Sequence, residues 1–370
     1  MREVGWDEFS GWVWAQRELP FAVDAVHLEQ SCFLAGDREG GLACWDLEGS
    51  LRWNADAGQR VEDFASGRDG EREMMYVTAG LHVIGISSND GDIIWRQELE
   101  GSSEAVLFDS EDDRVVVTSS VYDIEHHAFT EAACWFFSPS GESLGVERFD
   151  ERAWHLALRG DGVLLGLGRP RGGLLIGDAG DLEYSDLGDS PVTCGHTRGG
   201  TSLLGHADGS FTVHGPRGAE TRSSGCSIIT AVLLAEEGVA LVGDQHGMLA
   251  AFREDDMLWS VDLDDEVAVL AATSYEGTAC IWACTRRAEG SGLFLIAQED
   301  GERLLGSKSS ARIRCMSSHG THILFGLDDG MVLLHEMEML ARRLSLTTDG
   351  EQKVDARREE MLGRLRGLRD

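Results

Sequence analysis

Short apolar runs alternate with polar turns along nearly the whole chain, and this pattern predicts a protein built from β-strands. The runs are rich in Val, Ile, Leu, Ala and Phe, and they are bounded by Gly, Asp, Asn and Ser. Turn glycines recur about every forty residues, at Gly49, Gly91, Gly141, Gly180, Gly218 and, after a double interval, Gly301. A small β-unit repeated around an axis produces such a period, so the expected fold class is all-β, a β-propeller.

A second set of glycines marks the turn between the second and third strands of the repeating unit. Five Gly-x-x-x-Gly patterns end at Gly40, Gly172, Gly209, Gly247 and Gly330, and each last glycine is expected to take a positive φ. The pattern predicts eight four-stranded blades, with seven as the alternative. The first strands are expected to begin near Asp24, Val61, Glu104, Trp154, Val192, Ser227, Val267 and Arg312.

The two ends of the chain decide how such a ring closes. Residues 12–19 form an orphan strand in phase with the outer turns, and this strand can complete the last blade. The alternative makes Met339–Leu344 the last outer strand. Residues 1–346 are expected to form the propeller, and residues 347–370 a linker with a short amphipathic C-terminal helix.

Residues 41–53 and 241–259 carry the repeat most clearly, each with an apolar run, a turn and a tryptophan. These units resemble the quinoprotein-like (PQQ-like) and WD-type β-propeller repeats, and the resemblance covers roughly residues 11–335. It implies a propeller and no particular activity. Quinoprotein enzymes of this family carry adjacent disulfide-bonded cysteines and calcium ligands. This sequence has no adjacent cysteines and no recognisable calcium cluster, so we expect no cofactor and no catalytic residue.

Charge and cysteine usage indicate the surroundings of the protein. The sequence has 65 acidic and 32 basic residues, a net charge of −33, which disfavours direct binding to nucleic acid. Such a composition fits either a high-salt habitat or ordinary selection for solubility. The sequence has no apolar stretch behind a basic start, and no apolar run of about 20 residues for a membrane span. We therefore expect a cytoplasmic protein whose eight scattered cysteines are free thiols.

Polar turn residues and tryptophans are expected to be structural. One set lies in the turns between second and third strands, and its oxygen and imidazole groups could alternatively bind a metal: His206, Asp208, Asp244, His246, Asp328 and Asp329. Turns of this kind need such residues in any case. A second set has the phase of the repeat and is expected to pack between neighbouring blades: Trp45, Trp53, Trp95, Trp259 and Trp282.

Two segments depart from the repeat and are the candidate partner-binding elements. The third unit has residues 120–130 where other units have a tight turn, and this loop carries Tyr122, His126, His127 and Phe129. The tail places Met361, Leu362, Leu365 and Leu368 on one stripe of the expected helix.

These features predict a non-catalytic intracellular scaffold that assembles or regulates a complex through protein–protein contacts. We expect a monomeric propeller within a hetero-complex. The alternative is an enzyme or sensor that binds a small ligand or a metal at the central channel.

Overall fold

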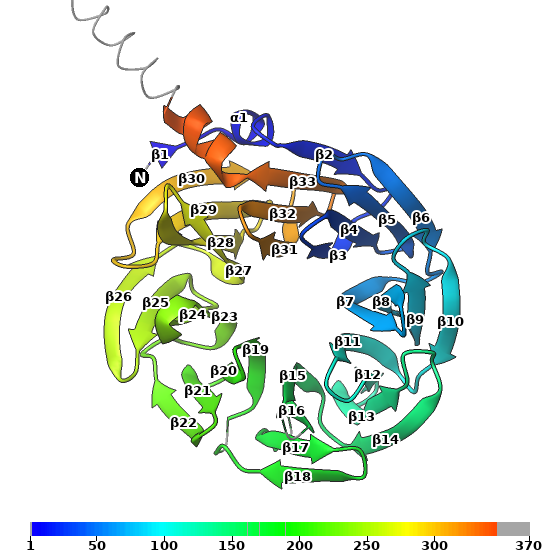
Figure 1. Cartoon of the computed structure of the whole chain (residues 1–370). Coiled ribbons are helices and arrows are strands. Elements are labelled where there is room, and N and C mark those ends of the chain that lie inside the picture. The colour runs from blue at the N-terminus through cyan, green and yellow to red at the C-terminus, as the bar shows by residue number, and fades with distance from the viewer. Residues whose placement is uncertain (1, 161, 170, 189, 346–370) are drawn as a thin grey trace, which may run out of the picture.

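The structure, a computed structural model, describes residues 2–160, 162–169, 171–188 and 190–345. These residues form a closed ring of eight sheets arranged around a central axis, as Figure 1 shows. The predicted eight-bladed β-propeller is confirmed, and the alternative of seven blades is wrong.

Each blade is an antiparallel sheet whose first strand lies innermost (Figure 1). Blade 1 contains β3 (Val23–Leu28), β4 (Cys32–Asp37), β5 (Gly41–Asp46) and β6 (Leu51–Asp56). Blade 2 contains β7 (Val61–Asp69), β8 (Arg72–Ala79), β9 (His82–Ser87) and β10 (Ile93–Glu98). Blade 3 contains β11 (Ser102–Asp109), β12 (Arg114–Asp123), β13 (Ala128–Phe137) and β14 (Ser143–Phe149). Blade 4 contains β15 (Ala153–Arg159), β16 (Gly162–Leu167), β17 (Leu174–Asp178) and β18 (Asp181–Ser185).

The second half of the ring repeats the same order. Blade 5 contains β19 (Val192–Arg198), β20 (Thr201–His206), β21 (Ser210–Gly215) and β22 (Gly218–Ser223). Blade 6 contains β23 (Ile229–Leu234), the 3₁₀ turn η1 (Glu236–Gly238), β24 (Ala240–Asp244), β25 (Met248–Arg253) and β26 (Asp256–Asp262). Blade 7 contains β27 (Glu266–Tyr275), β28 (Thr278–Arg286), β29 (Ser291–Ala297) and β30 (Arg303–Ser309). Blade 8 contains β31 (Ile313–His319), β32 (His322–Leu327) and β33 (Met331–Glu336).

The N-terminal segment closes the ring. Strand β2 (Ala15–Glu18) pairs antiparallel with β33 as the fourth strand of blade 8, so the favoured closure is confirmed. Ahead of it, β1 (Arg2–Glu3) pairs parallel with β30 as a fifth strand of blade 7, and helix α1 (Trp6–Ser10) follows. Blue N-terminal strands therefore lie beside the orange C-terminal blade in Figure 1.

The alternative closing strand at Met339–Leu344 is wrong, because residues 337–345 are helical. Met337, Leu340, Ala341 and Leu344 are buried and follow each other at intervals of three or one residues, as on one side of a helix. Both ends of the ring are thus held by the same two blades.

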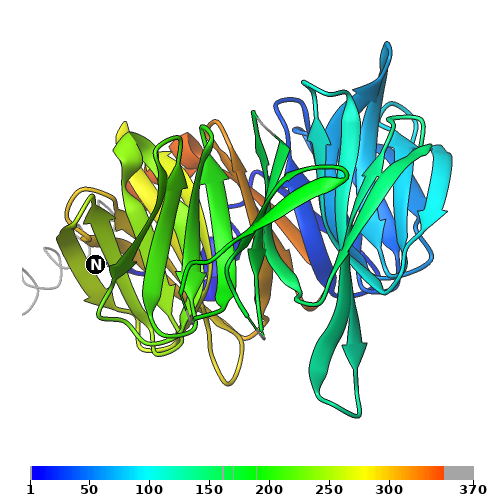
Figure 2. The same cartoon turned by 90° about the horizontal axis from the view of Figure 1, so that it is seen from below.

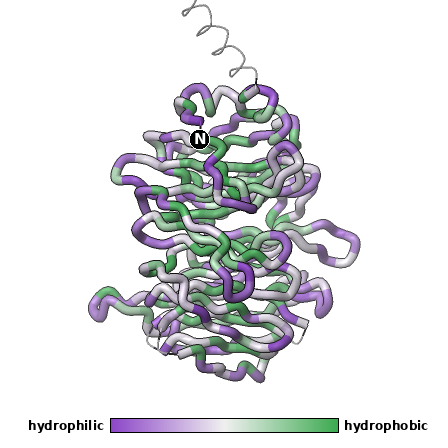
Figure 3. The backbone as a smooth tube through the Cα atoms, turned by 90° about the vertical axis from the view of Figure 1, so that its left-hand side faces the viewer, coloured by the Kyte–Doolittle hydropathy of each residue, from purple (hydrophilic) through white to green (hydrophobic). Residues whose placement is uncertain are grey.

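The turn pattern of the sequence is confirmed closely. Every expected first strand begins within two residues of its predicted position. The last glycine of each Gly-x-x-x-Gly turn has a positive φ, from 74° at Gly172 to 106° at Gly40. Figure 3 shows the result: hydrophobic backbone lies along the strands, and hydrophilic backbone gathers at the turns on both faces.

The core fills the wedges between neighbouring blades. The largest cluster joins blades 7 and 8 around Trp282 and Phe325, and it includes Phe9 of α1. All five tryptophans of the repeat phase pack in such inter-blade clusters, as predicted. Folding thus buries these rings and joins the blades in the same step.

Three outer-strand tryptophans also join blades by a repeated hydrogen bond. The indole Nε1 atoms of Trp53, Trp95 and Trp259 donate to backbone carbonyls of the next blade, each at 2.8 Å. Their rings lie directly over turn glycines of that blade, at Gly91, Gly141 and Gly301. The glycine recurs because the turn needs a positive φ and because the ring leaves no room for a Cβ atom.

Replacing one of these glycines tests this double role. We expect Gly91→Ala to lower the free energy of unfolding by about 1–3 kcal/mol more than Gly180→Ala in urea denaturation. Gly180 is the matched control, because it has a φ of +84° at the same turn but open space around a Cβ atom, whereas a Cβ at Gly91 would lie 2.8 Å from the Trp53 ring. Equal losses in the two variants would show that only φ matters.

Candidate functional site

The two faces of the ring carry different kinds of turn. Because neighbouring strands are antiparallel, the turn between the second and third strands lies at the same end as the connection into the next first strand. We call this end the hairpin face, because the hairpin of β12 and β13 protrudes from it (Figure 2). The other end is called the opposite face.

The segment expected to be a loop in blade 3 is mostly strand. Cross-strand pairing of β12 with β13 continues through Tyr122 opposite Phe129 and ends at Asp123 opposite Ala128. Only residues 124–127 form the turn. The β-branched and aromatic residues of this segment favour a strand, so the insertion extends the blade instead of leaving it.

The turn of the hairpin is fixed by Asp123. Its carboxylate accepts hydrogen bonds from the backbone N–H groups of Glu125 and His126 at 2.7 and 3.1 Å, and from Nδ1 of His126 at 2.8 Å. The bond from the His126 side chain lowers the pKa of Asp123. His127 takes a positive φ of 51°. The two histidines therefore shape the turn, while Tyr122 and Phe129 lie together on the strands.

An aromatic cluster links this hairpin to blade 4. The Tyr122 and Phe129 rings meet edge to face at 5.1 Å, and Phe129 meets Trp154 of β15 at 6.3 Å. The guanidinium of Arg152 lies 3.9 Å from the Trp154 ring centre and 4.8 Å from that of Phe129. We define the aromatic cluster as Tyr122, Phe129, Arg152 and Trp154.

This cluster is exposed although its rings are large. Tyr122 is 49% exposed, Trp154 43%, and Ile124 at the tip of the hairpin 77%. Most other exposed large apolar side chains, such as Leu51 and Leu144, lie along the outermost strands around the rim. Phe21, Leu81 and Ile228 lie singly in turns of the hairpin face. Apolar surface gathered on a protruding hairpin and on the strand beside it indicates a contact site.

A ring of strand irregularities shapes the channel at the hairpin face. In all eight first strands the pairing register with the second strand shifts near the start, as in a β-bulge. The residues at these shifts are Asp24, Glu62, Glu104, Trp154, Thr193, Thr230, Ala268 and Arg314. Bulges commonly re-aim a side chain next to a functional site.

Half of this ring is charged. The Asp24 side chain is fully buried and is contacted by Arg314, by Arg60 at 2.7 Å and by Arg38 at 3.5 Å. Arg60 also contacts Glu62 at 3.1 Å. Burial raises the pKa of Glu62, against the opposing effect of Arg60.

The network continues toward the hairpin and then stops. Glu104 contacts Arg152 of the aromatic cluster at 2.7 Å, and burial raises the pKa of Glu104 as well. In blades 5 and 6 the corresponding residues are neutral: the hydroxyls of Thr193 and Thr230 donate to backbone carbonyls of the next blade at 2.6 and 2.7 Å. The charged half is therefore the half that adjoins the hairpin.

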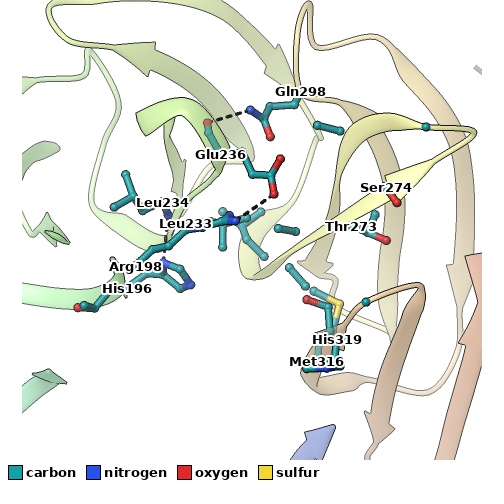
Figure 4. A pocket seen from close by; sticks show the side chains of 18 residues that line it. His196, Arg198, Leu233, Leu234, Glu236, Thr273, Ser274, Gln298, Met316 and His319 are labelled. Atoms are coloured by element: carbon teal, nitrogen blue, oxygen red, sulfur yellow. Dashed lines mark hydrogen bonds and ion pairs between the residues drawn. The ribbon is translucent and has the colours of Figure 1, made fainter. Parts of the chain in front are cut away.

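The opposite face holds a cavity of about 800 Å³ at the channel between blades 5 and 8 (Figure 4). Nδ1 of His196 accepts the backbone N–H of Leu234 at 3.2 Å, and burial lowers the pKa of His196. Arg198 pairs with Glu236 at 3.0 Å, and His319 lies across the opening. The lining is a mixture of hydroxyl, imidazole and aliphatic groups with one internal ion pair, which suits a neutral polar ligand.

The polar turn residues for which metal binding was the alternative accept hydrogen bonds from nearby backbone N–H groups. The Asp244 carboxylate accepts backbone N–H bonds from Ser227, His246 and Met248, each at 2.9 Å. Asp328 accepts the backbone N–H of Arg312 at 2.8 Å. Within the described part of the chain no three His, Cys, Asp or Glu side chains are grouped to hold a metal ion.

Two of the predicted partner-binding residues, Tyr122 and Phe129, come together in the aromatic cluster. His126 and His127 lie beside it in the turn. The predicted tail residues Met361, Leu362, Leu365 and Leu368 lie outside the described residues. Sequence reasoning missed Arg152 and Trp154 as site residues, although Trp154 is the one aromatic residue at a position where the other seven blades have charged or small residues.

Comparisons with known proteins support the fold. No protein-family model and no curated protein matches the chain. The computationally designed Ika8 protein matches with TM-score 0.70 and 14% identity over 86% of this chain and 98% of its own. BamB from Moraxella catarrhalis has TM-score 0.64 and 15% identity over 86% and 95%. Sqt1 from Saccharomyces cerevisiae has TM-score 0.69 and 10% identity over 87% and 97%.

At these identities the matches show a β-propeller fold and nothing of its function. The resemblance inferred from the sequence is therefore confirmed as far as the β-propeller fold, and no family model supports the PQQ-like or WD-type repeat family itself. Among the described residues no helix has the length and apolar character needed to cross a membrane.

Proposed function

We propose that this propeller is a non-catalytic scaffold that binds a protein partner on its hairpin face, through the β12–β13 hairpin and the aromatic cluster. The observation that carries the proposal is the exposure of Tyr122 and Ile124 on the protruding hairpin and of Trp154 on β15 beside it. Trp, Tyr and Arg side chains dominate the binding energy of protein interfaces. The free, mostly buried cysteines suit a reducing compartment, and we place the protein in the cytoplasm.

The rigid hairpin favours tight contact. The cross-strand pair of Tyr122 and Phe129 and the hydrogen bonds to Asp123 hold the tip in one conformation before a partner arrives. Less conformational entropy is then lost on binding. Burying an apolar side chain fully contributes about 1.5–3 kcal/mol, so a few such side chains can decide an interaction.

A second candidate function is binding of a small ligand in the cavity of the opposite face. Its volume of about 800 Å³ lies in the range typical of ligand sites. Against it, typical ligand pockets are mostly apolar, whereas hydroxyl and charged groups such as Thr273, Ser274 and Arg198 line this one. The two candidate sites lie on different faces, so substitutions separate them.

The hairpin is tested by affinity capture from the native organism. We expect the double variant Tyr122→Ser/Ile124→Ser to recover at least tenfold less of the partner than the wild type, with an unchanged melting temperature. The matched control is Leu51→Ser/Leu144→Ser, two side chains that are each 56% exposed on outer strands. Equal recovery by both double variants would contradict the proposal.

A further inference from the structure

We infer that the partner presents an acidic segment with a hydrophobic side chain, whose carboxylates bind arginines at the channel mouth of the hairpin face. This inference rests on the proposed function and specifies the chemistry of its partner. The arginines are Arg286, Arg312 and Arg314 of blades 7 and 8, Arg38 of blade 1, Arg60 before β7 and Arg152 before β15. We call these six residues the arginine arc.

The first argument is an excess of guanidinium groups. Asp24 is a single buried carboxylate, yet three members of the arc contact it: Arg38, Arg60 and Arg314. Its single negative charge cannot balance three positive charges. Glu62 offsets part of the difference, but burial raises the pKa of this carboxyl and so weakens its hold on a negative charge.

The second argument is a cavity that contains arginines but no acid. A hollow of about 300 Å³ between blades 7 and 8 is lined by Arg286, Arg312 and Arg314, with Ser291 and three aliphatic residues. Arg286 is paired with Glu266 at 2.9 Å. The exposed Arg312 side chain makes one long contact, from Nη2 to the carbonyl of Ala288 at 3.5 Å. A carboxylate entering this hollow would meet donors already in place.

The third argument is that the arc and the aromatic cluster are continuous. Arg152 belongs to both, since its Nε contacts Glu104 while its guanidinium lies against Trp154 and Phe129. The charge of Arg152 also acts on Glu62, where it opposes the rise that burial causes in the pKa of this carboxyl. A segment lying across the mouth can thus place a hydrophobic side chain on the aromatic cluster and carboxylates on the arc.

The acidity of the rest of the protein makes this contact selective. With a net charge of −33, most of the surface repels an acidic segment. Binding of the same segment to the rim or the opposite face is therefore unfavourable, and binding is favourable only where guanidinium groups are in excess. Unfavourable contacts elsewhere add specificity to the favourable ones.

The probe is a phage library of random dodecapeptides, selected on the immobilised full-length protein at 150 mM NaCl. We expect the enriched peptides to combine Asp or Glu with aromatic or aliphatic residues. In fluorescence anisotropy, their affinity should fall at least tenfold for Arg38→Gln/Arg312→Gln. These two arginines are exposed, and neither is the only partner of a buried carboxylate, so the variant should fold.

The matched control is Arg72→Gln/Arg253→Gln, which removes the same charge from two exposed positions on the opposite face, at the start of β8 and the end of β25. Its affinity should stay within twofold of the wild type. Enrichment of neutral or basic peptides, or equal effects of the two double variants, would overturn the inference. If those peptides still lose affinity in Tyr122→Ser/Ile124→Ser, the proposed hairpin contact stands and only the acidic partner is rejected. If no peptide responds to either set of variants, the inference is likewise overturned, and the capture experiment alone decides the scaffold function.

Discussion

Substituting Phe9 by alanine is expected to lower the free energy of unfolding by about 3–5 kcal/mol, the cost of deleting a large buried ring. Phe9 is fully buried although it belongs to a helix of only five residues. Its ring stacks on His335 at 4.4 Å and meets the edge of Trp282 at 5.8 Å, so it fills the wedge between blades 7 and 8. Chemical denaturation of the variant and the wild type measures the loss.

The control is Phe21→Ala, a ring of the same size close in sequence but 51% exposed. It should change the free energy of unfolding by no more than about 0.5 kcal/mol. Similar losses in the two variants would mean that α1 covers the propeller without stabilising the closure between blades 7 and 8. The comparison isolates the contribution of the Phe9 contacts between blades 7 and 8, because neither substitution touches strand β2 or its pairing with β33.

The fold was largely predictable because its constraints are local. A turn that needs a positive φ selects glycine wherever it recurs, so Gly40, Gly209 and Gly247 reveal the repeat without any knowledge of packing. The sequence alone leaves residues 337–345 open between a helix and the alternative closing strand at Met339–Leu344. The spacing of Met337, Leu340 and Leu344 is helical, and an apolar run alone does not separate the two.

The candidate site was predictable only in part, because it depends on contacts between blades. Tyr122 and Phe129 interrupt the repeat and so stand out in the sequence. Arg152 and Trp154 belong to the next unit, and only the closed ring brings them against the hairpin. The three arginines around Asp24 come from three different blades, and their spacing in the sequence does not predict that they contact the same carboxylate.

Stability should fall in mild acid, and His335 should account for a measurable part of the fall. His335 lies fully buried between Phe9 and Phe325, and neither ring nitrogen has a hydrogen-bond partner among the described residues. Burial lowers its pKa from 6.5 to about 3. Below pH 6.5 the unfolded chain therefore binds a proton at His335 that the folded protein does not bind. The stabilisation is complete above pH 6.5 and is lost progressively as the pH falls toward 3.

At pH 5 this loss amounts to about 2 kcal/mol, since each pH unit below 6.5 contributes about 1.4 kcal/mol. Between pH 7.5 and 5.0, His335→Leu should therefore lose about 2 kcal/mol less stability than the wild type in urea denaturation, whatever its stability at pH 7.5. His127→Asn, an exposed histidine at the hairpin turn, should behave as the wild type. The buried Asp63 carboxyl, whose pKa burial raises to about 6, acts in the opposite direction but equally in all three proteins. Parallel pH profiles for His335→Leu and the wild type would show that His335 gains its proton in the folded ring, with water or a shifted Phe9 beside it.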